Sequence, residues 1–141
     1  MHIDLSGRRA LVTGSTSGMG YAIAKGLAES GAAVVVHGRS NERVTAACAR
    51  LTQEVPGADL SGHAAELADA EAVDRLIAEA PQVDILINNA GPIESRPFFE
   101  ISDEDWQRFF DVYVMAAVRL ARHHARRMMD RGWGRVLFSA G

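Results

Sequence analysis

The chain has 141 residues, of which 48% are hydrophobic and 23% are charged. This length and composition predict one folded domain over residues 1–141, with its own hydrophobic core. The net charge of −3 provides no electrostatic attraction for nucleic acid or for an anionic membrane. No apolar run reaches transmembrane length, and the single cysteine, Cys48, fits a reducing, cytoplasmic compartment.

Short apolar runs alternate with amphipathic helical patterns along the chain. The apolar runs predict buried strands at 8–14, 32–38, 61–67, 83–91 and 135–141. The helical patterns predict helices at 17–30, 40–53, 69–80 and 102–131. Ser40 and Ser102 are the predicted N-caps of the second and fourth helices. This alternation predicts an α/β fold, a doubly wound parallel sheet with five strands and four helices, truncated after the fifth strand.

The segment between the first predicted strand and helix has the sequence TGSTSGMG, with Gly14, Gly18 and Gly20 in a G-x-x-x-G-x-G spacing. A dinucleotide needs a tight turn after the strand, close backbone approach to its pyrophosphate, and a helix N-terminus directed at the negative charge. Glycines permit the first two, and the helix that begins near Ser17 provides the third. We therefore expect cofactor binding here. Glycines that only form a turn are the alternative interpretation.

The second predicted strand ends in the sequence HGRS, which places Arg39 just beyond it. NAD-binding sites usually have a carboxylate here for the ribose 2′-hydroxyl, whereas an arginine suits the 2′-phosphate of NADP. Since Gly38 is not acidic, the sequence favours NADP, with NAD as the alternative cofactor. A solvated loop cation is the other interpretation of Arg39.

Three segments together resemble the short-chain dehydrogenase/reductase family. They are TGSTSGMG at 13–20, NNAG at 88–91, and GRVLFSAG at 134–141, where the fifth strand of that family begins. The resemblance covers the whole chain and implies a Rossmann-type sheet that binds a nicotinamide dinucleotide. It also implies hydride transfer between the nicotinamide and an alcohol or carbonyl.

The resemblance assigns cofactor contacts to positions in this sequence. It implies that the pyrophosphate is cradled by Gly14, Ser15, Gly18, Met19 and Gly20. Near the adenine it places Glu66 and Leu67, and under the cofactor it places Asn89, Ala90 and Gly91. It further implies that Asn88 ties adjacent strands together.

The catalytic residues of that family have no complete match here. Tyr113, in FFDVYVM, stands where the family has a catalytic Asn, and the position of its catalytic Ser falls on Gly141. Ser139 lies two residues earlier and would count only if the strand were shorter than expected. The family's catalytic Tyr-x-x-x-Lys belongs to the helix after this strand, which this chain does not include. No catalytic residue is therefore assigned.

Two tyrosines remain to be interpreted. Tyr21 and Lys25 reproduce the Tyr-x-x-x-Lys spacing, but they lie on the first helix, away from the expected nicotinamide position. We expect these two side chains to pack together on the helix surface. Tyr113 is either a substitute acid or, as we favour, an aromatic side chain on the buried face of its helix.

The predicted helix over 103–131 has apolar residues on more than one side, which predicts burial on two sides. The resemblance implies a subunit interface along this helix, and an unpaired sheet edge at the fifth strand also favours a homo-oligomer. No metal site is predicted. The adjacent His123 and His124 point about 100° apart on a helix, and no acidic residue or cysteine completes a ligand set.

Two functions are compatible with these features. The chain is either an NAD(P)-dependent oxidoreductase, present as its cofactor-binding half, or a catalytically inactive nucleotide-binding or interaction module derived from such an enzyme. Tyr113 and Gly141 favour the second function, because truncation alone would not alter residues inside the chain. Cofactor binding is expected in both cases, and turnover by this chain alone in neither.

Overall fold

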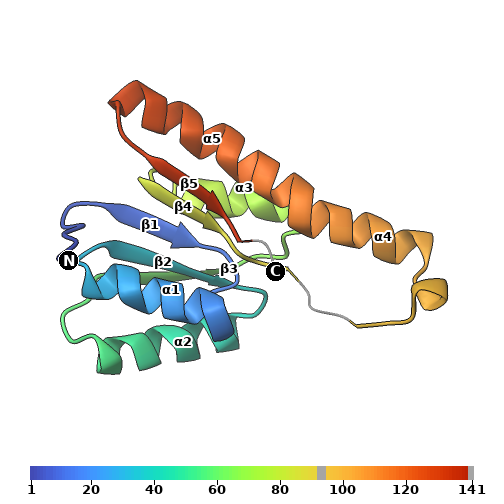
Figure 1. The fold of residues 1–141 in the computed structure, drawn as a ribbon, viewed down its shortest axis with the longest axis horizontal. Helices are drawn as coiled ribbons and strands as arrows, with labels where there is room; N and C mark the ends of the chain where they lie inside the picture. Colours follow the sequence, from blue (N-terminus) through green and yellow to red (C-terminus); the bar gives the residue numbers. More distant parts are fainter. Residues whose placement is uncertain (92–94, 140–141) are drawn as a thin grey trace.

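The structure is a computed structural model that describes residues 1–91 and 95–139. Its five parallel strands form one sheet in the order β3-β2-β1-β4-β5 (Figure 1). The strands are β1 (Arg9–Val12), β2 (Ala33–Gly38), β3 (Leu60–Ala64), β4 (Ile85–Asn88) and β5 (Arg135–Phe138). The α-helices are α1 (Gly18–Glu29), α2 (Asn41–Glu54), α3 (Ala70–Glu79), α4 (Asp103–Phe110) and α5 (Ala116–Arg131). The predicted doubly wound α/β fold is confirmed.

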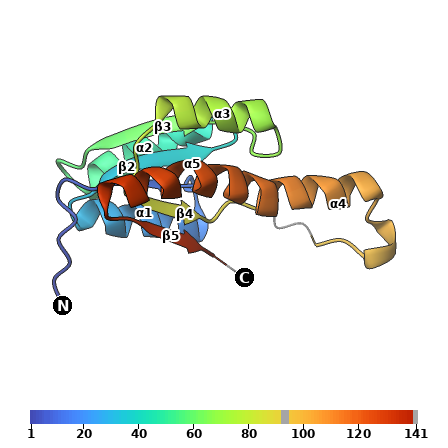
Figure 2. The same cartoon turned by 90° about the horizontal axis from the view of Figure 1, so that it is seen from above.

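Helices cover both faces of the sheet. Figure 1 and Figure 2 show α1 and α2 on one face and α3 and α5 on the other. Successive residues of a strand point to opposite faces, so Ala10 and Val12 pack with α1 and α2, whereas Leu11 packs with α3 and α5. Burial on both faces explains why the strands are continuous apolar runs rather than alternating ones.

The observed strands are shorter than the predicted ones, but the helix boundaries agree closely. The β3 strand begins at Leu60 and ends at Ala64, and β5 ends at Phe138. Both predicted N-caps are confirmed, because the hydroxyl of Ser40 accepts a hydrogen bond from the N–H of Arg43, and Ser102 forms a capping box with Asp105. The shorter strands place more residues at the carboxyl ends of the sheet, where parallel sheets bind ligands.

The predicted helix over 102–131 is a continuous helical run with an irregular centre. A π-helical turn, η2 (Asp111–Met115), joins α4 to α5, and a short 3₁₀ turn, η1 (Phe98–Glu100), precedes the run. Figure 1 and Figure 2 show α4 projecting past the carboxyl ends of the strands. Single π-helical turns often occur at functional sites. The 3.6-residue apolar pattern gave no sign of this turn.

In this single chain the run is buried on one side, and its burial on a second side, against another subunit, stays a prediction. Its exposed apolar side chains are Trp106, Phe110, Val114, Val118 and Met129. The helix face that packs on the sheet is instead Ala116, Ala117, Leu120 and Met128. Across residues 1–91 and 95–139, no helix combines the length and the hydropathy needed to cross a membrane.

Candidate functional site

A cavity of about 1000 Å³ opens at the carboxyl ends of the strands. Its wall is formed by the glycine loop, the ends of β2, β4 and β5, the segment after β3, and the π-helical turn with the start of α5. All but one of the predicted cofactor-binding residues line it: Gly14, Gly18, Met19, Gly20, Arg39, Glu66, Leu67, Asn89, Ala90 and Gly91. The topology brings together residues that lie far apart in the sequence.

The glycine loop requires glycine for two different reasons. Gly14 and Gly18 adopt φ angles of 63° and 58°, in the left-handed region that side chains disfavour. A Cβ on Gly14 would lie 2.9 Å from the Cα of Ala90, and one on Gly20 would overlap the carbonyl oxygen of Gly14. The loop therefore packs its backbone directly against the segment after β4.

The N-terminus of α1 faces the cavity with open hydrogen-bond donors. The first N–H groups of a helix have no acceptor within the helix, and the side chain of Ser17 makes no capping hydrogen bond. The backbone of Gly18, Met19 and Gly20 thus presents donors and the positive end of the helix dipole to the cavity. This donor set fits the pyrophosphate of a dinucleotide.

Ser15 is the predicted contact residue that does not line the cavity. Its side chain is fully buried, and its hydroxyl donates to the carbonyl of Val12 at 2.7 Å. The Ser15 N–H donates to the carbonyl of His37 at 2.8 Å, and the Ser15 hydroxyl accepts from the His37 N–H at 2.9 Å. Ser15 therefore connects the glycine loop to β1 and β2 beneath the cavity, and its side chain does not face the cavity.

The imidazole of His37 makes a second contact with the glycine loop. Its Nδ1 accepts from the N–H of Gly14 at 3.1 Å, and its Nε2 lies 2.9 Å from the carbonyl oxygen of Ala65. Burial lowers the pKa of His37. The sequence contained no local signal for this role, because the partners lie 23 and 28 residues away.

The NNAG segment after β4 is fastened to both neighbouring strands. The side-chain amide of Asn89 donates to the carbonyls of Thr13 and Gly14 at 3.2 Å each. The hydroxyl of Thr13 accepts from the N–H groups of Asn89 and Ala90 at 3.0 Å each. On the other side, Asn88 donates from its side chain to the carbonyl of Leu137, at 3.4 Å, as expected for a strand-tying residue.

Tyr113 is not on the buried face of its helix, so that expectation is wrong. Its side chain is 49% exposed and lines the cavity from within the π-helical turn. A Cβ on Gly91 would overlap the Tyr113 ring, so the absence of a side chain at Gly91 makes room for the ring. The phenol thus lies at the β4–β5 end of the cavity.

Ser139 directly follows β5 and also lines the cavity. Its N–H donates to the carbonyl of Asn88 at 3.0 Å, and its hydroxyl donates to Oδ1 of Asn89 at 3.2 Å. The strand ends earlier than expected, at Phe138, and a catalytic role for Ser139 stays unassigned. Gly141, the position aligned with the family's serine, lies outside the described residues.

Tyr21 and Lys25 form a structural link between α1 and α2. Tyr21 is buried between these helices, which corrects the expectation of a surface position. The ammonium of Lys25 lies 3.1 Å from the carboxylate of Glu54, and the guanidinium of Arg50 lies 4.3 Å from the Tyr21 ring centroid. Burial raises the pKa of Tyr21, opposite to the change that a tyrosine acid requires.

Further polar groups at the cavity were not identified from the sequence. Arg43 lines both the cavity and a smaller adjoining hollow of about 430 Å³, close to Arg39 in the chain. At the other end, Arg108 contributes to the wall from α4. Among residues 1–91 and 95–139, no cluster of three or more His, Cys, Asp or Glu side chains is arranged to hold a metal ion.

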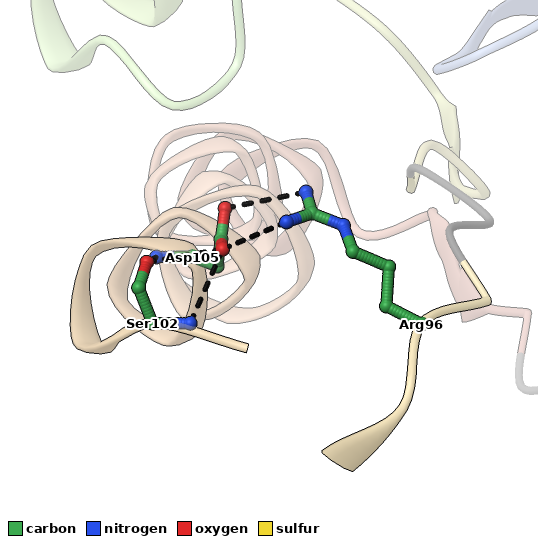
Figure 3. A network of polar contacts seen from close by, with 3 residues as sticks. All are labelled: Arg96, Ser102 and Asp105. Atoms are coloured by element: carbon green, nitrogen blue, oxygen red, sulfur yellow. Dashed lines mark hydrogen bonds and ion pairs between the residues drawn. The ribbon is translucent and has the colours of Figure 1, made fainter. Parts of the chain in front are cut away.

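A polar network anchors the segment that leads into α4. Figure 3 shows the guanidinium of Arg96 directed at the carboxylate of Asp105, with Nη1–Oδ2 and Nη2–Oδ1 distances of 3.0 and 3.4 Å. The same carboxylate accepts from the N–H and the hydroxyl of Ser102. These hydrogen bonds from Ser102, with the nearby Arg96, lower the pKa of Asp105. The network joins the segment before α4 to the first turn of that helix.

The family model described as short chain dehydrogenase matches residues 8–140. The chain belongs to this family. Among its short-chain dehydrogenase relatives is the uncharacterized oxidoreductase YvaG of Bacillus subtilis (strain 168), which is 44% identical over 140 residues. That match covers 99% of this chain and 53% of YvaG. The chain thus spans about half the length of the curated relatives it matches.

Solved short-chain dehydrogenase structures have the same fold. The L-sorbose reductase from Gluconobacter frateurii, complexed with NADPH and L-sorbose, superposes with a TM-score of 0.90 at 37% identity, over 98% of this chain and 54% of that one. A gluconate 5-dehydrogenase from Burkholderia cenocepacia J2315, in complex with NADP and tartrate, gives a TM-score of 0.80 at 33% identity. This match covers 97% of this chain and 55% of that one.

Proposed function

We propose that this chain is the cofactor-binding half of an NAD(P)-dependent oxidoreductase that acts on an alcohol or a carbonyl. The observation that carries the proposal is the cavity itself, in which the donors at the N-terminus of α1 meet a glycine loop shaped for close backbone approach. The NADP and NADPH complexes of similar proteins support the choice of cofactor.

The sheet order suggests how the dinucleotide lies in the cavity. Ligands of doubly wound sheets bind at the point where the strand order reverses, which here is between β1 and β4. We assign the pyrophosphate to the loop residues Gly14, Gly18, Met19 and Gly20. We assign the adenosine end to Arg39, Glu66 and Leu67 and the nicotinamide end to Asn89, Ala90 and Gly91. When bound, the cofactor supplies or accepts the hydride.

We propose that residues 1–141 form one binding unit that lacks turnover on its own. Tyr113 replaces the expected asparagine, and the match covers only about half the length of the relatives. The catalytically inactive nucleotide-binding module is the second candidate function, and Tyr113 favours it. Both candidates predict no turnover of a carbonyl panel with NADPH by this chain, and activity that is lost in Tyr113→Phe would contradict an inactive module.

We also propose a homo-oligomer in a reducing, cytoplasmic compartment. The exposed apolar face of α4 and α5, which includes Trp106, Phe110 and Met129, supports a contact between copies of this chain. The β5 strand lies at the sheet edge with Leu137 and Phe138 exposed, which also favours association. The cysteine content supports the compartment, since Cys48 has no partner for a disulfide in this sequence.

Arg39→Ala tests whether the adenosine end of the cofactor, with its 2′-phosphate, lies at Arg39. Loss of the guanidinium is expected to weaken NADPH binding about tenfold or more while leaving NADH binding nearly unchanged, because only NADPH carries the 2′-phosphate. Calorimetry or NADPH fluorescence measures both affinities. Arg126→Ala is the matched control, since Arg126 is an exposed arginine on α5 that pairs only weakly with Asp130. Equal losses for both cofactors would contradict the assignment.

A further inference from the structure

His37 is buried at the carboxyl end of β2, with 1% of its surface exposed. The N–H of Gly14 can only donate, so the Nδ1 that it contacts at 3.1 Å must carry a lone pair. The other nitrogen, Nε2, therefore carries the proton and donates it to the carbonyl of Ala65 at 2.9 Å. The contacts fix both the charge and the tautomer: His37 is neutral and protonated on Nε2.

The imidazole connects three strand ends beneath the cavity. Gly14 lies two residues after β1, His37 is the residue before the last in β2, and Ala65 follows β3. The backbone of His37 adds two hydrogen bonds with Ser15, so one residue of β2 holds two consecutive residues of the glycine loop. The Gly14 that it holds has a φ of 63° and packs against Ala90.

We propose that neutral His37 is a positioning residue for the dinucleotide, which holds the glycine loop in its binding conformation through the N–H of Gly14, and that protonation of His37 weakens dinucleotide binding. If Nδ1 were protonated, its N–H would face the N–H of Gly14, and the hydrogen bond between the two residues would be lost because both groups are donors. The inference rests on the function proposed above. It adds a residue that acts through the loop and not by touching the cofactor's reacting atoms.

The groups around His37 set the direction of the pH effect. Burial, the largest cause, lowers the pKa of His37, while the hydrogen bond to Ala65 and the charge of Glu66 act in the opposite direction. His63 is the register partner of His37 on β3 and pairs with Glu79. Since the pKa of His37 is below its ordinary value of 6.5, the hydrogen bond between Gly14 and His37 is intact above that pH. The bond is lost as the solution becomes more acidic.

His37→Val tests the hydrogen bond between Gly14 and His37. Valine fits a strand of valines but cannot accept the Gly14 hydrogen bond, so NADPH affinity near neutral pH is expected to fall about five- to tenfold. In the free protein, the amide of Gly14 should exchange with solvent faster in this variant, measured by NMR. His63→Val is the matched control, because it removes the neighbouring imidazole on β3 without touching the loop. Unchanged affinity and exchange in His37→Val would overturn the proposal.

His37→Asn is the rescue variant. The side-chain oxygen of asparagine accepts a hydrogen bond at a position similar to Nδ1 and does not titrate, so affinity should return and its decline in acid should be reduced. The titration of the 2′-phosphate is common to both proteins and cancels in the comparison of wild type with His37→Asn. Identical pH profiles of NADPH affinity in wild type and His37→Asn would contradict the positioning role of His37. So would an affinity that asparagine does not restore, even if His37→Val fails to fold.

The two proposals fail separately in these experiments. If the wild-type chain does not bind NADPH, the proposed function is wrong. The exchange rate of the Gly14 amide in the free protein still tests whether His37 holds the loop. If NADPH binds with wild-type affinity to every His37 variant, the cofactor function stands and the positioning role is wrong.

Discussion

The two ends of the cavity are built differently. The loop end, defined by Gly14–Gly20, His37 and Ala65, is held by buried hydrogen bonds between three strand ends. The helix end, defined by Tyr113, Ala116, Leu120 and Phe138, is formed by a π-helical turn and apolar side chains, of which Tyr113 and Phe138 are half-exposed or more. A pyrophosphate needs donors fixed in advance, whereas a flat aromatic ring can bind to an apolar wall.

Gly20→Ala is expected to have the largest effect, because it breaks the loop end directly. The added Cβ would overlap the carbonyl of Gly14 and crowd the side-chain amide of Asn89, which are both fixed by other contacts. We expect NADPH affinity to fall by about 100-fold or more, since the loop must move away from its binding conformation. Calorimetric titration measures the loss.

Gly26→Ala is the control for that change. Gly26 lies on the same helix, and a Cβ there meets no atom within 4 Å. Alanine is the better helix former, so this variant should gain about 0.5–1 kcal/mol in the free energy of unfolding with unchanged affinity. Wild-type affinity in Gly20→Ala would show that the loop end is not rigid.

The packing behind the helix end should lose stability in acid through His124. This residue on α5 is fully buried, and within the described chain neither ring nitrogen has a hydrogen-bond partner. Burial, with the nearby His123 and Arg127, lowers the pKa of His124 to about 4. The unfolded chain therefore binds the proton more readily, so stability is full above pH 6.5 and declines as the pH falls toward 4.

The expected loss is about 3 kcal/mol between these pH values, measured by denaturant unfolding across the range. His124→Leu removes the titrating group and should flatten this decline while keeping or raising stability at neutral pH, because the buried ring nitrogens make no hydrogen bond that leucine would lose. His2→Leu is the control, since His2 is exposed near the N-terminus. A pH profile unchanged in His124→Leu would contradict the assignment of the decline to this residue.

The elements of the loop end that could be predicted from the sequence are those with local signals. The spacing of Gly14, Gly18 and Gly20 reflects backbone conformation and close approach within one turn, and both are present in the structure. Apolar runs predicted the sheet because its strands are buried on both faces. Arg39 was found from its place after β2, and it lines the cavity as expected.

The parts that the sequence did not reveal depend on distant partners. The role of His37 is set by Gly14 and Ala65, and the displacement of Ser15 from the cavity wall follows from its bonds to Val12 and to β2. The position of Tyr113 depends on a π-helical turn, which shifts side chains around the helix axis without changing the apolar pattern. None of these contacts has a periodicity that a sequence displays.

Tyr113→Ala gives the smallest expected effect and tests the helix end. The ring lines the cavity against Gly91, which follows β4. Arg39 follows β2, and these two strands lie on opposite sides of β1 in the sheet order. An aromatic side chain there should contact the nicotinamide half, and loss of such contacts costs about 0.7 kcal/mol, or about threefold in affinity. The comparison uses NADPH and 2′-phospho-ADP-ribose, which lacks only the nicotinamide.

Only the affinity for NADPH should fall in Tyr113→Ala, because 2′-phospho-ADP-ribose has no nicotinamide to contact the ring. Val114→Ala is the matched control: Val114 belongs to the same turn and is 41% exposed, but it does not line the cavity. A tighter complex with NADPH in Tyr113→Ala would mean that the ring obstructs the helix end. An equal loss for both ligands would instead place Tyr113 within the support of the loop end, and the division of the cavity into two independent ends would then be wrong.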